Sequence, residues 1–134
     1  MTTEIITLGT DHDMAIAGRT ANQIAAKYAF TRYQSRKAAN TLKAQKQALG
    51  TFADYLNHAN ITVTSDALYT SPLAWDGMTF GLVSGFVEWL ATRGYAIGSI
   101  NAKLAHVKVY AKLAAQARVI DPTEYALIRT VTGF

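Results

Sequence analysis

Apolar side chains recur at steps of three and four along most of the chain, which is the spacing of α-helices that bury one face. The first such pattern begins near Thr20, a suitable N-cap residue, and continues to about Gln34. Residues 35–39 interrupt it. The sequence therefore predicts a first helix over residues 20–34.

A second helix is predicted to start with Asn40 or Thr41 as its N-cap and to end near His58. Its inward stripe has members at steps of three and four: Leu42, Gln45, Leu49, Phe52 and Leu56. Three polar side chains fall away from that stripe and are expected to be exposed: Lys43, Lys46 and Gln47.

Residues 60–77 carry Ser, Asp, Thr, Pro and Gly among scattered β-branched residues, and this composition predicts the longest loop. Thr79 is then the expected N-cap of a third helix, which Gly94 ends. The apolar members of this helix are Leu82, Val83, Phe86, Trp89 and Leu90.

A fourth helix is expected to open at Gly98-Ser99, and a short fifth one after Asp121, where Pro122 suits the first helical turn. The stripe of the fourth helix is Ile100, Leu104, Val107, Ala111 and Ala114. No segment reads as a strand, so we expect an all-α fold: a compact bundle of four to five helices.

A length of 134 residues suits one domain. Residues 1–19 mix β-branched residues with Gly9 and are expected to form a flexible arm, which leaves residues 20–134 as the helical domain. Asp11, His12 and Asp13 are potential metal ligands, but three consecutive residues do not share a helix face, so no metal site is expected.

The chain has no cysteine, which excludes disulfide scaffolds and thiolate chemistry and fits a reducing compartment. The N-terminus lacks the pattern of a signal peptide, and no stretch approaches about 20 apolar residues. We therefore expect a cytoplasmic protein that has no contact with a membrane.

Enzyme chemistry finds no support in the sequence. No glycine-rich loop with a lysine follows a strand, and the acidic residues are too scattered to form a catalytic pair. Ser84 stands between glycines, but it lacks the spacing and the strand-to-helix setting of a nucleophile elbow. We predict no catalytic residue and no cofactor.

Positive charge is concentrated in two stretches without an acid, although the net charge is only +4. The first, residues 14–53, contains Arg19, Lys27, Arg32, Arg36, Lys37, Lys43 and Lys46. The second, residues 89–120, contains Arg93, Lys103, Lys108, Lys112 and Arg118. Side by side they would attract a polyanion such as nucleic acid, whereas apart they are ordinary solvated helix faces.

Aromatic residues leave a further alternative open. Most lie on apolar stripes and are expected in the core, with Tyr33 the least certain because basic residues surround it. Trp75, Phe80, Phe86 and Trp89 gather around the third helix, and part of that surface could instead face another domain or protein.

Three motifs follow one another along the chain. The first is Asn40-Thr41-Leu42-Lys43, followed by Leu49, Phe52 and Leu56. The second is Phe86-Val87-Glu88-Trp89-Leu90 before Gly94, and the third is Ser99-Ile100-Asn101 before a long helix. In this order they resemble the N-terminal core-binding, or SAM-like, domain of tyrosine recombinases and phage integrases. Residues 119–122 resemble the transition to the catalytic domain, whereas Gln45 stands about where the family has a tyrosine.

The resemblance implies a domain that clamps duplex DNA together with a C-terminal catalytic domain, which would cut and rejoin the strands. It implies that the parent protein is a recombinase, active as a homo-oligomer (a tetramer) on DNA, in the prokaryotic cytoplasm. The catalytic arginines, histidine and tyrosine of that family would lie outside this sequence, so the fragment itself would not be an enzyme.

Carried onto matching positions, the resemblance makes two helix starts the DNA contacts. One is Asn40, Thr41 and Lys43, and the other is Ser99, Asn101 and Lys103. Helix N-termini and short polar side chains suit phosphates and base edges, although Thr41 and Ser99 could serve only as caps. Additional phosphate contacts are expected at Lys46, Gln47, His106, Arg36 and Lys37.

Two other functions remain possible from the sequence. A helix-turn-helix regulator needs two short helices joined by a tight turn, and the long gap at residues 60–77 argues against one there. A helical protein-interaction module would bind its partner with little dependence on phosphate or salt, whereas DNA binding would weaken steeply as salt rises.

Overall fold

The computed structural model describes residues 2–134, with side chains from Asp13 onward. Within that range the fold is all-α, with six α-helices, one 3₁₀ turn and no strand. The elements are α1 (Thr2–Gln34), α2 (Ala39–His58), α3 (Ser65–Thr70), η1 (Pro72–Trp75), α4 (Phe80–Thr92), α5 (Ile97–Gln116) and α6 (Pro122–Ile128). The predicted all-α class is confirmed, whereas the described chain has six α-helices rather than the expected four to five, and five of the six have seven or more residues.

Helix α1 is longer than the sequence pattern predicted. It begins at Thr2 rather than near Thr20, so the expected N-cap role of Thr20 is wrong. Threonine, isoleucine and the two glycines of this segment, Gly9 and Gly18, each lower helix propensity by about 1 kcal/mol or less, and no proline interrupts it. The division into an arm of residues 1–19 and a domain of residues 20–134 stays a prediction.

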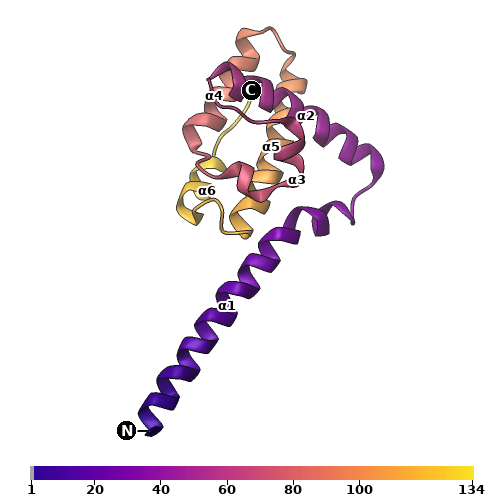
Figure 1. Ribbon diagram of the computed structural model, residues 1–134. Coiled ribbons are helices and arrows are strands. Elements are labelled where there is room, and N and C mark those ends of the chain that lie inside the picture. The colour runs from indigo at the N-terminus through magenta and orange to yellow at the C-terminus, as the bar shows by residue number, and fades with distance from the viewer. Residues whose placement is uncertain (1) are drawn as a thin grey trace.

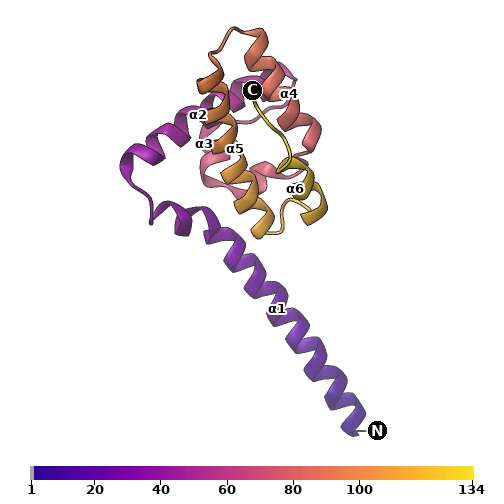
Figure 2. The same cartoon turned by 180° about the vertical axis from the view of Figure 1, so that it is seen from behind.

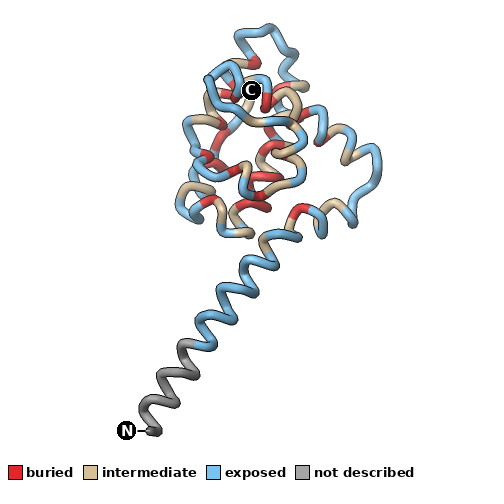
Figure 3. Tube along the Cα trace, in the orientation of Figure 1, coloured by how far each residue is buried: buried red, intermediate tan, exposed pale blue. Residues whose placement is uncertain are grey.

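The described N-terminal part of α1 projects from the body as a rod (Figure 1). Every residue from Asp13 to Ala25 is exposed, whereas Phe30 near the other end is fully buried (Figure 3). The exposed side chains include large apolar ones: Met14, Ile16, Ile24 and Tyr28. The packing that holds α1 to the body is therefore confined to its last turns.

Helices α2 and α5 both start earlier than predicted. Their N-caps are Ala38 and Ala96, which have extended backbones and no capping side chain. The expected caps Asn40, Thr41 and Ser99 lie instead within the first turns. Alanine is the best helix former, which favours a helix that already includes Ala39 in α2. Helix α5 likewise begins at Ile97, and a turn precedes each of the two helices.

The predicted loop at residues 60–77 contains two short helical elements, α3 and η1, so its description as a loop is wrong. Thr64 caps α3 by accepting a hydrogen bond from the Ala67 N–H, and Pro72 opens η1. Trp75 is fully buried and donates its Nε1–H to the Leu68 carbonyl at 3.0 Å. Burial of this one large side chain ties the segment to the core, which scattered polar residues conceal in the sequence.

The predicted boundaries of α4 and the predicted start of α6 are confirmed. The Thr79 hydroxyl accepts from the Leu82 N–H, and the Asp121 carboxylate accepts from the Thr123 N–H at 2.8 Å. Gly94 ends α4 with a φ of +81°, a conformation that glycine adopts without strain.

The core is built around Phe52 on α2. Its ring stacks on Trp75 at 5.7 Å and meets the edge of Phe86 on α4 at 4.9 Å. Of the aromatic residues grouped around the third predicted helix, Trp75 and Phe86 are buried, Trp89 is half-buried and Phe80 is exposed. Core packing therefore accounts for most of that group.

Candidate nucleic-acid interface

A buried polar contact fixes where α2 crosses its neighbours. Gln45 is 2% exposed and donates through Nε2 to the Tyr33 hydroxyl at 2.8 Å. Its Oε1 accepts from the Tyr110 hydroxyl at 3.2 Å, and Gln34 donates to that same hydroxyl at 3.2 Å. The end of α1, the start of α2 and the second half of α5 therefore meet at one point.

The residues of the first predicted contact group lie close to this crossing, on α2 and on the link before it. Arg36 and Lys37 lie on the link between α1 and α2, and backbone bonds from their N–H groups to Tyr33 and Gln34 hold that link in a tight turn. Asn40, Lys43 and Gln47 on α2 are exposed, and Thr41 is half-buried. Lys43 and Gln47 are four residues apart, so they share one helix face opposite Gln45.

Several of the predicted contact lysines lie over tyrosine rings. Lys37 Nζ is 5.1 Å from the centre of the Tyr33 ring, and Lys46 Nζ is 4.9 Å from that of Tyr69. Lys103 Nζ lies 5.8 Å from the Tyr95 ring. A ring positions an ammonium group without neutralising its charge, so these lysines keep their positive charge for an anionic partner.

Two members of the second predicted group, Ser99 and Lys103, share a face of α5 with His106, which was predicted as an additional phosphate contact. These three residues are spaced by four and three, and Tyr110 continues the same face toward α2. Burial, and then the charge of Lys103, lowers the pKa of His106 below its ordinary value of 6.5. His106 is therefore neutral near pH 7 and serves there as a hydrogen-bonding group rather than a cation.

Asn101 lies on another side of α5 and is already engaged. Its Nδ2 donates to the Phe134 carbonyl at 2.9 Å, while its Oδ1 accepts from the Phe134 N–H at 3.0 Å. The structure thus separates Asn101 from Ser99 and Lys103, with which the sequence motif had grouped it.

The two helix starts do not lie side by side. Gln45 sits near the beginning of α2, yet its partner Tyr110 is eleven residues beyond Ser99, or about 16 Å along the axis of α5. Figure 2 shows the α5 start near α4, whereas the α2 start lies beside the end of α1. The predicted contacts therefore form two groups at different heights along α5.

The predicted contact helices share a further feature. The N-termini of α2 and α5 have no side-chain cap, whereas Thr64, Thr79 and Asp121 cap α3, α4 and α6. The first-turn N–H groups of α2 and α5 are thus not satisfied by a capping side chain. The interpretation that Thr41 and Ser99 act only as caps is wrong.

A groove beside the first group was not predicted from the sequence. It has a volume of about 430 Å³ and lies between the end of α1, the link and the last turns of α5. Its polar lining is Arg32, Arg36, Lys37, Tyr33 and Gln116, and its floor includes Ala29 and Leu113. The sequence placed Arg32 in the first acid-free stretch but did not predict it as a contact. Only the crossing of α1 and α5 shows that Arg32 and Arg36 line the same groove.

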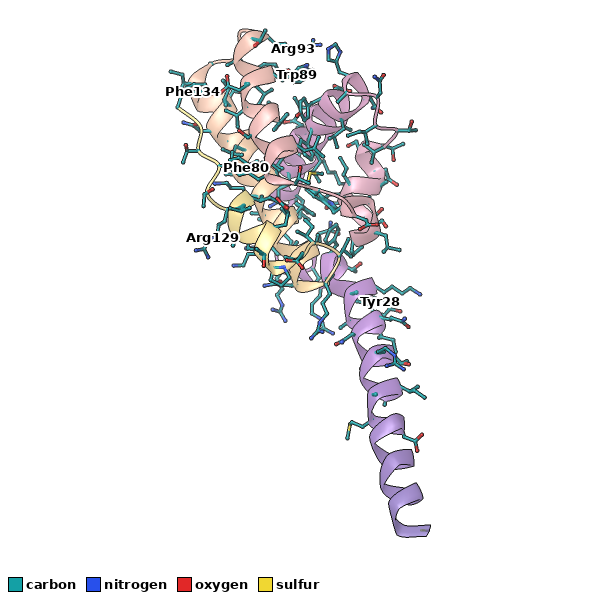
Figure 4. The ribbon with its side chains drawn as sticks, turned by 90° about the vertical axis from the view of Figure 1, so that its left-hand side faces the viewer. Tyr28, Phe80, Trp89, Arg93, Arg129 and Phe134 are labelled. Carbon is teal, nitrogen blue, oxygen red and sulfur yellow. The ribbon has the colours of Figure 1, made fainter. Side chains whose placement is uncertain are left out.

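Two other surface features lie apart from these groups. A hollow of about 740 Å³ separates α1 from η1 and the segment after α5, and its lining includes Asp76 beside Lys27 and Arg118. Arg93 stacks over the Trp89 ring at 4.1 Å at the far end of α4 (Figure 4). Mixed charge in the hollow makes it less suited to a polyanion than the groove.

Metal clusters and membrane-spanning helices are both lacking among the described residues. No group of three or more His, Asp or Glu side chains there could hold a metal ion, and Asp11 and His12 lie outside the described side chains. Between Thr2 and Phe134, no helix combines the length and apolarity needed to cross a bilayer.

Comparison with known proteins does not assign the chain to a family. No family model matches the chain, and no similar protein was found among curated sequences or solved structures.

Proposed function

We propose that this chain is a DNA-binding domain of the SAM-like, core-binding type found in tyrosine recombinases, and that it grips duplex DNA through α2 and α5. The strand cleavage and rejoining of such a recombinase would be carried out by a catalytic domain outside this sequence. From the same resemblance, we propose that the parent protein acts as a tetramer on DNA and is located in the cytoplasm of a prokaryote.

One observation carries the proposal: the cations of the acid-free stretch gather where α1 ends and α2 begins. Arg32, Arg36, Lys37 and Lys43 are all exposed there, and the Tyr33 ring beside Lys37 leaves its charge unneutralised. Such a cluster releases counterions from DNA when it binds phosphates, which is the main source of non-specific affinity.

The two groups suit different parts of a duplex. The lysines and arginines would contact phosphates and set the position of the protein, whereas Asn40, Gln47 and Ser99 have the short donors and acceptors that read base edges. A separation of about 16 Å or more along α5 exceeds the major-groove width of about 12 Å, so the groups can contact phosphates on both sides of one groove.

The tyrosines of this chain have no assigned catalytic role in the proposal. Tyr110 is fully buried, and burial raises its pKa to about 12. A buried phenol held neutral by its surroundings is a poor nucleophile and cannot reach a DNA phosphate. Burial therefore excludes Tyr110 as a nucleophile for strand cleavage.

Charge-removing variants test the proposal. Lys43→Ala and Lys103→Ala should each weaken binding to random-sequence duplex and make the slope of log K against log salt shallower by about one. Arg129→Ala is the matched control, because this exposed arginine points outward from the α6 side of the body (Figure 4). Equal affinities for all three variants would contradict the proposal.

The second candidate, a helical protein-interaction module, is favoured by the exposed apolar residues of α1. Met14 is 71% exposed and Ile24 is 56% exposed on the projecting part of that helix. Binding of a protein through α1 would not respond to Lys43→Ala, so the same variants separate the two functions. A helix-turn-helix arrangement fits less well, since α3 has only six residues and six others separate it from α2.

A further inference from the structure

We propose that the groove between the end of α1 and the last turns of α5 is a seat for one phosphate group of the DNA backbone, with Arg32 and Gln116 as contacts. The inference rests on the proposed function and deepens it. It assigns a defined phosphate-binding groove to a surface for which the sequence predicted only exposed cations.

The chemistry of the groove suits a phosphate. Three of its lining residues are cationic, Arg32, Arg36 and Lys37, and no acidic residue lines it. Guanidinium groups present several N–H donors in a planar fork that matches two phosphate oxygens. Gln116 supplies an additional amide donor on the α5 side.

The walls are positioned by buried contacts rather than by the cations themselves. Phe30 and Tyr33 both meet the Tyr110 ring edge-on, at 5.2 and 6.0 Å, and these contacts hold the last turns of α1 against α5. The Tyr33 hydroxyl is held in turn by Gln45. A cation cluster on such a fixed frame loses less side-chain freedom on binding than one on a free helix.

Small residues create the space. Ala25 and Ala29 are four residues apart on α1, so their faces align, and both line the groove opposite Leu113. Larger side chains at these two positions would fill the volume between α1 and α5. The groove therefore depends on the size of these residues as well as on charge.

The dependence of the groove on small side chains distinguishes a phosphate bound inside it from a general electrostatic attraction of DNA to the cations. Ala25→Leu changes no charge but fills part of the groove, and Ala21→Leu is the matched control, one turn earlier on the exposed part of α1. Arg32→Gln removes one cation from the groove, with Arg129→Gln as its control on α6. Fluorescence anisotropy with labelled random-sequence duplex, at several salt concentrations, measures all four variants together with the unchanged chain.

The expected result is that Arg32→Gln and Ala25→Leu both weaken binding about tenfold, and that Arg32→Gln makes the salt slope shallower by about one. The two controls should bind as the unchanged chain does. Circular dichroism and thermal unfolding of each variant show that the fold persists. Because Ala25 is exposed, leucine there should not lower stability.

Three results would overturn the inference. If Arg32→Gln weakens binding while Ala25→Leu does not, the groove attracts DNA only diffusely. If neither variant differs from its control while Lys43→Ala still weakens binding, DNA binding stands but no phosphate sits in the groove. If NMR shows inorganic phosphate shifting the Ala29 amide while both variants retain full duplex affinity, the groove takes free phosphate and not the DNA backbone.

Discussion

The Tyr110 hydroxyl of α5 donates a 3.2 Å hydrogen bond to Oε1 of Gln45, the one buried polar side chain of the described core. This bond links two helices that the sequence predicted to contact DNA, at a point where neither is exposed. A buried acceptor that loses its donor keeps the full cost of its desolvation. The position of the contact surface is thus tied to an internal hydrogen bond.

Tyr110→Phe should therefore lower the free energy of unfolding by about 1–3 kcal/mol, because the ring still packs but Gln45 loses its donor. Urea unfolding measures the change. Tyr125→Phe, on α6 and only partly buried, is the matched control and should cost less. Equal losses for the two variants would show that the Tyr110–Gln45 bond adds nothing to stability.

Alkaline pH should weaken the fold through the same residue. Burial raises the pKa of Tyr110 to about 12, above its ordinary value of 10.0. The unfolded chain releases this proton first, so the stabilising contribution is complete below pH 10 and is lost as the pH rises toward 12. Ultraviolet absorbance of tyrosinate should show one tyrosine that ionises only near pH 12 or on unfolding, and that is absent in Tyr110→Phe.

Periodicity and caps predicted the helical bundle because each feature is local. Thr79, Gly94 and Asp121-Pro122 mark helix ends by interactions within a few residues, and the structure confirms them. The starts of α2 and α5 were misplaced because alanine caps carry no side-chain signal. Helices α3 and η1 were missed because each is short and polar residues surround their few buried side chains, Leu68, Pro72 and Trp75.

The candidate surface was predictable only in part. Exposure of Lys43 and Gln47 follows from their places opposite the apolar stripe of α2, and Ser99, Lys103 and His106 share a face by spacing alone. The groove at Arg32 requires two segments about eighty residues apart to cross, which no local pattern encodes. The role of Gln45 was not predicted, because only the fold shows that two tyrosine hydroxyls surround it.

Gly85 on α4 lies at a close approach to the Tyr55 side chain of α2. A Cβ at Gly85 would collide with the Tyr55 hydroxyl, whereas one at Gly81 would meet only the Thr79 hydroxyl at 3.8 Å. Gly85→Ala should destabilise the fold by about 1–3 kcal/mol, while Gly81→Ala should be neutral or stabilise it by up to about 1 kcal/mol. Thermal unfolding compares them.

Removal of the colliding hydroxyl provides the control for this prediction. In a double-mutant cycle, Tyr55→Phe should recover much of the loss caused by Gly85→Ala, because the ring then ends one atom earlier. Strictly additive effects of the two substitutions would mean that the helices adjust by another route.

His106 should make stability fall in mild acid. Its pKa is lowered in the folded state by burial and by Lys103, so the unfolded chain binds the proton first as the pH falls. The contribution is present above pH 6.5 and is lost as the pH falls through the lower folded value. NMR titration should show the His106 pKa rising toward its ordinary value in Lys103→Ala, and an unchanged value would exclude Lys103 as a cause.

The salt dependence of duplex binding by the unchanged chain tests the central claim most directly. With about five cations of the α1–α2 junction and α5 on phosphates, log K should fall linearly with log salt, with a slope of about −4.5. Fluorescence anisotropy with random-sequence duplex across a range of salt concentrations measures it. The account predicts clear binding at low salt that weakens with that slope, and an affinity that ignores salt, or no binding at low salt, would contradict it.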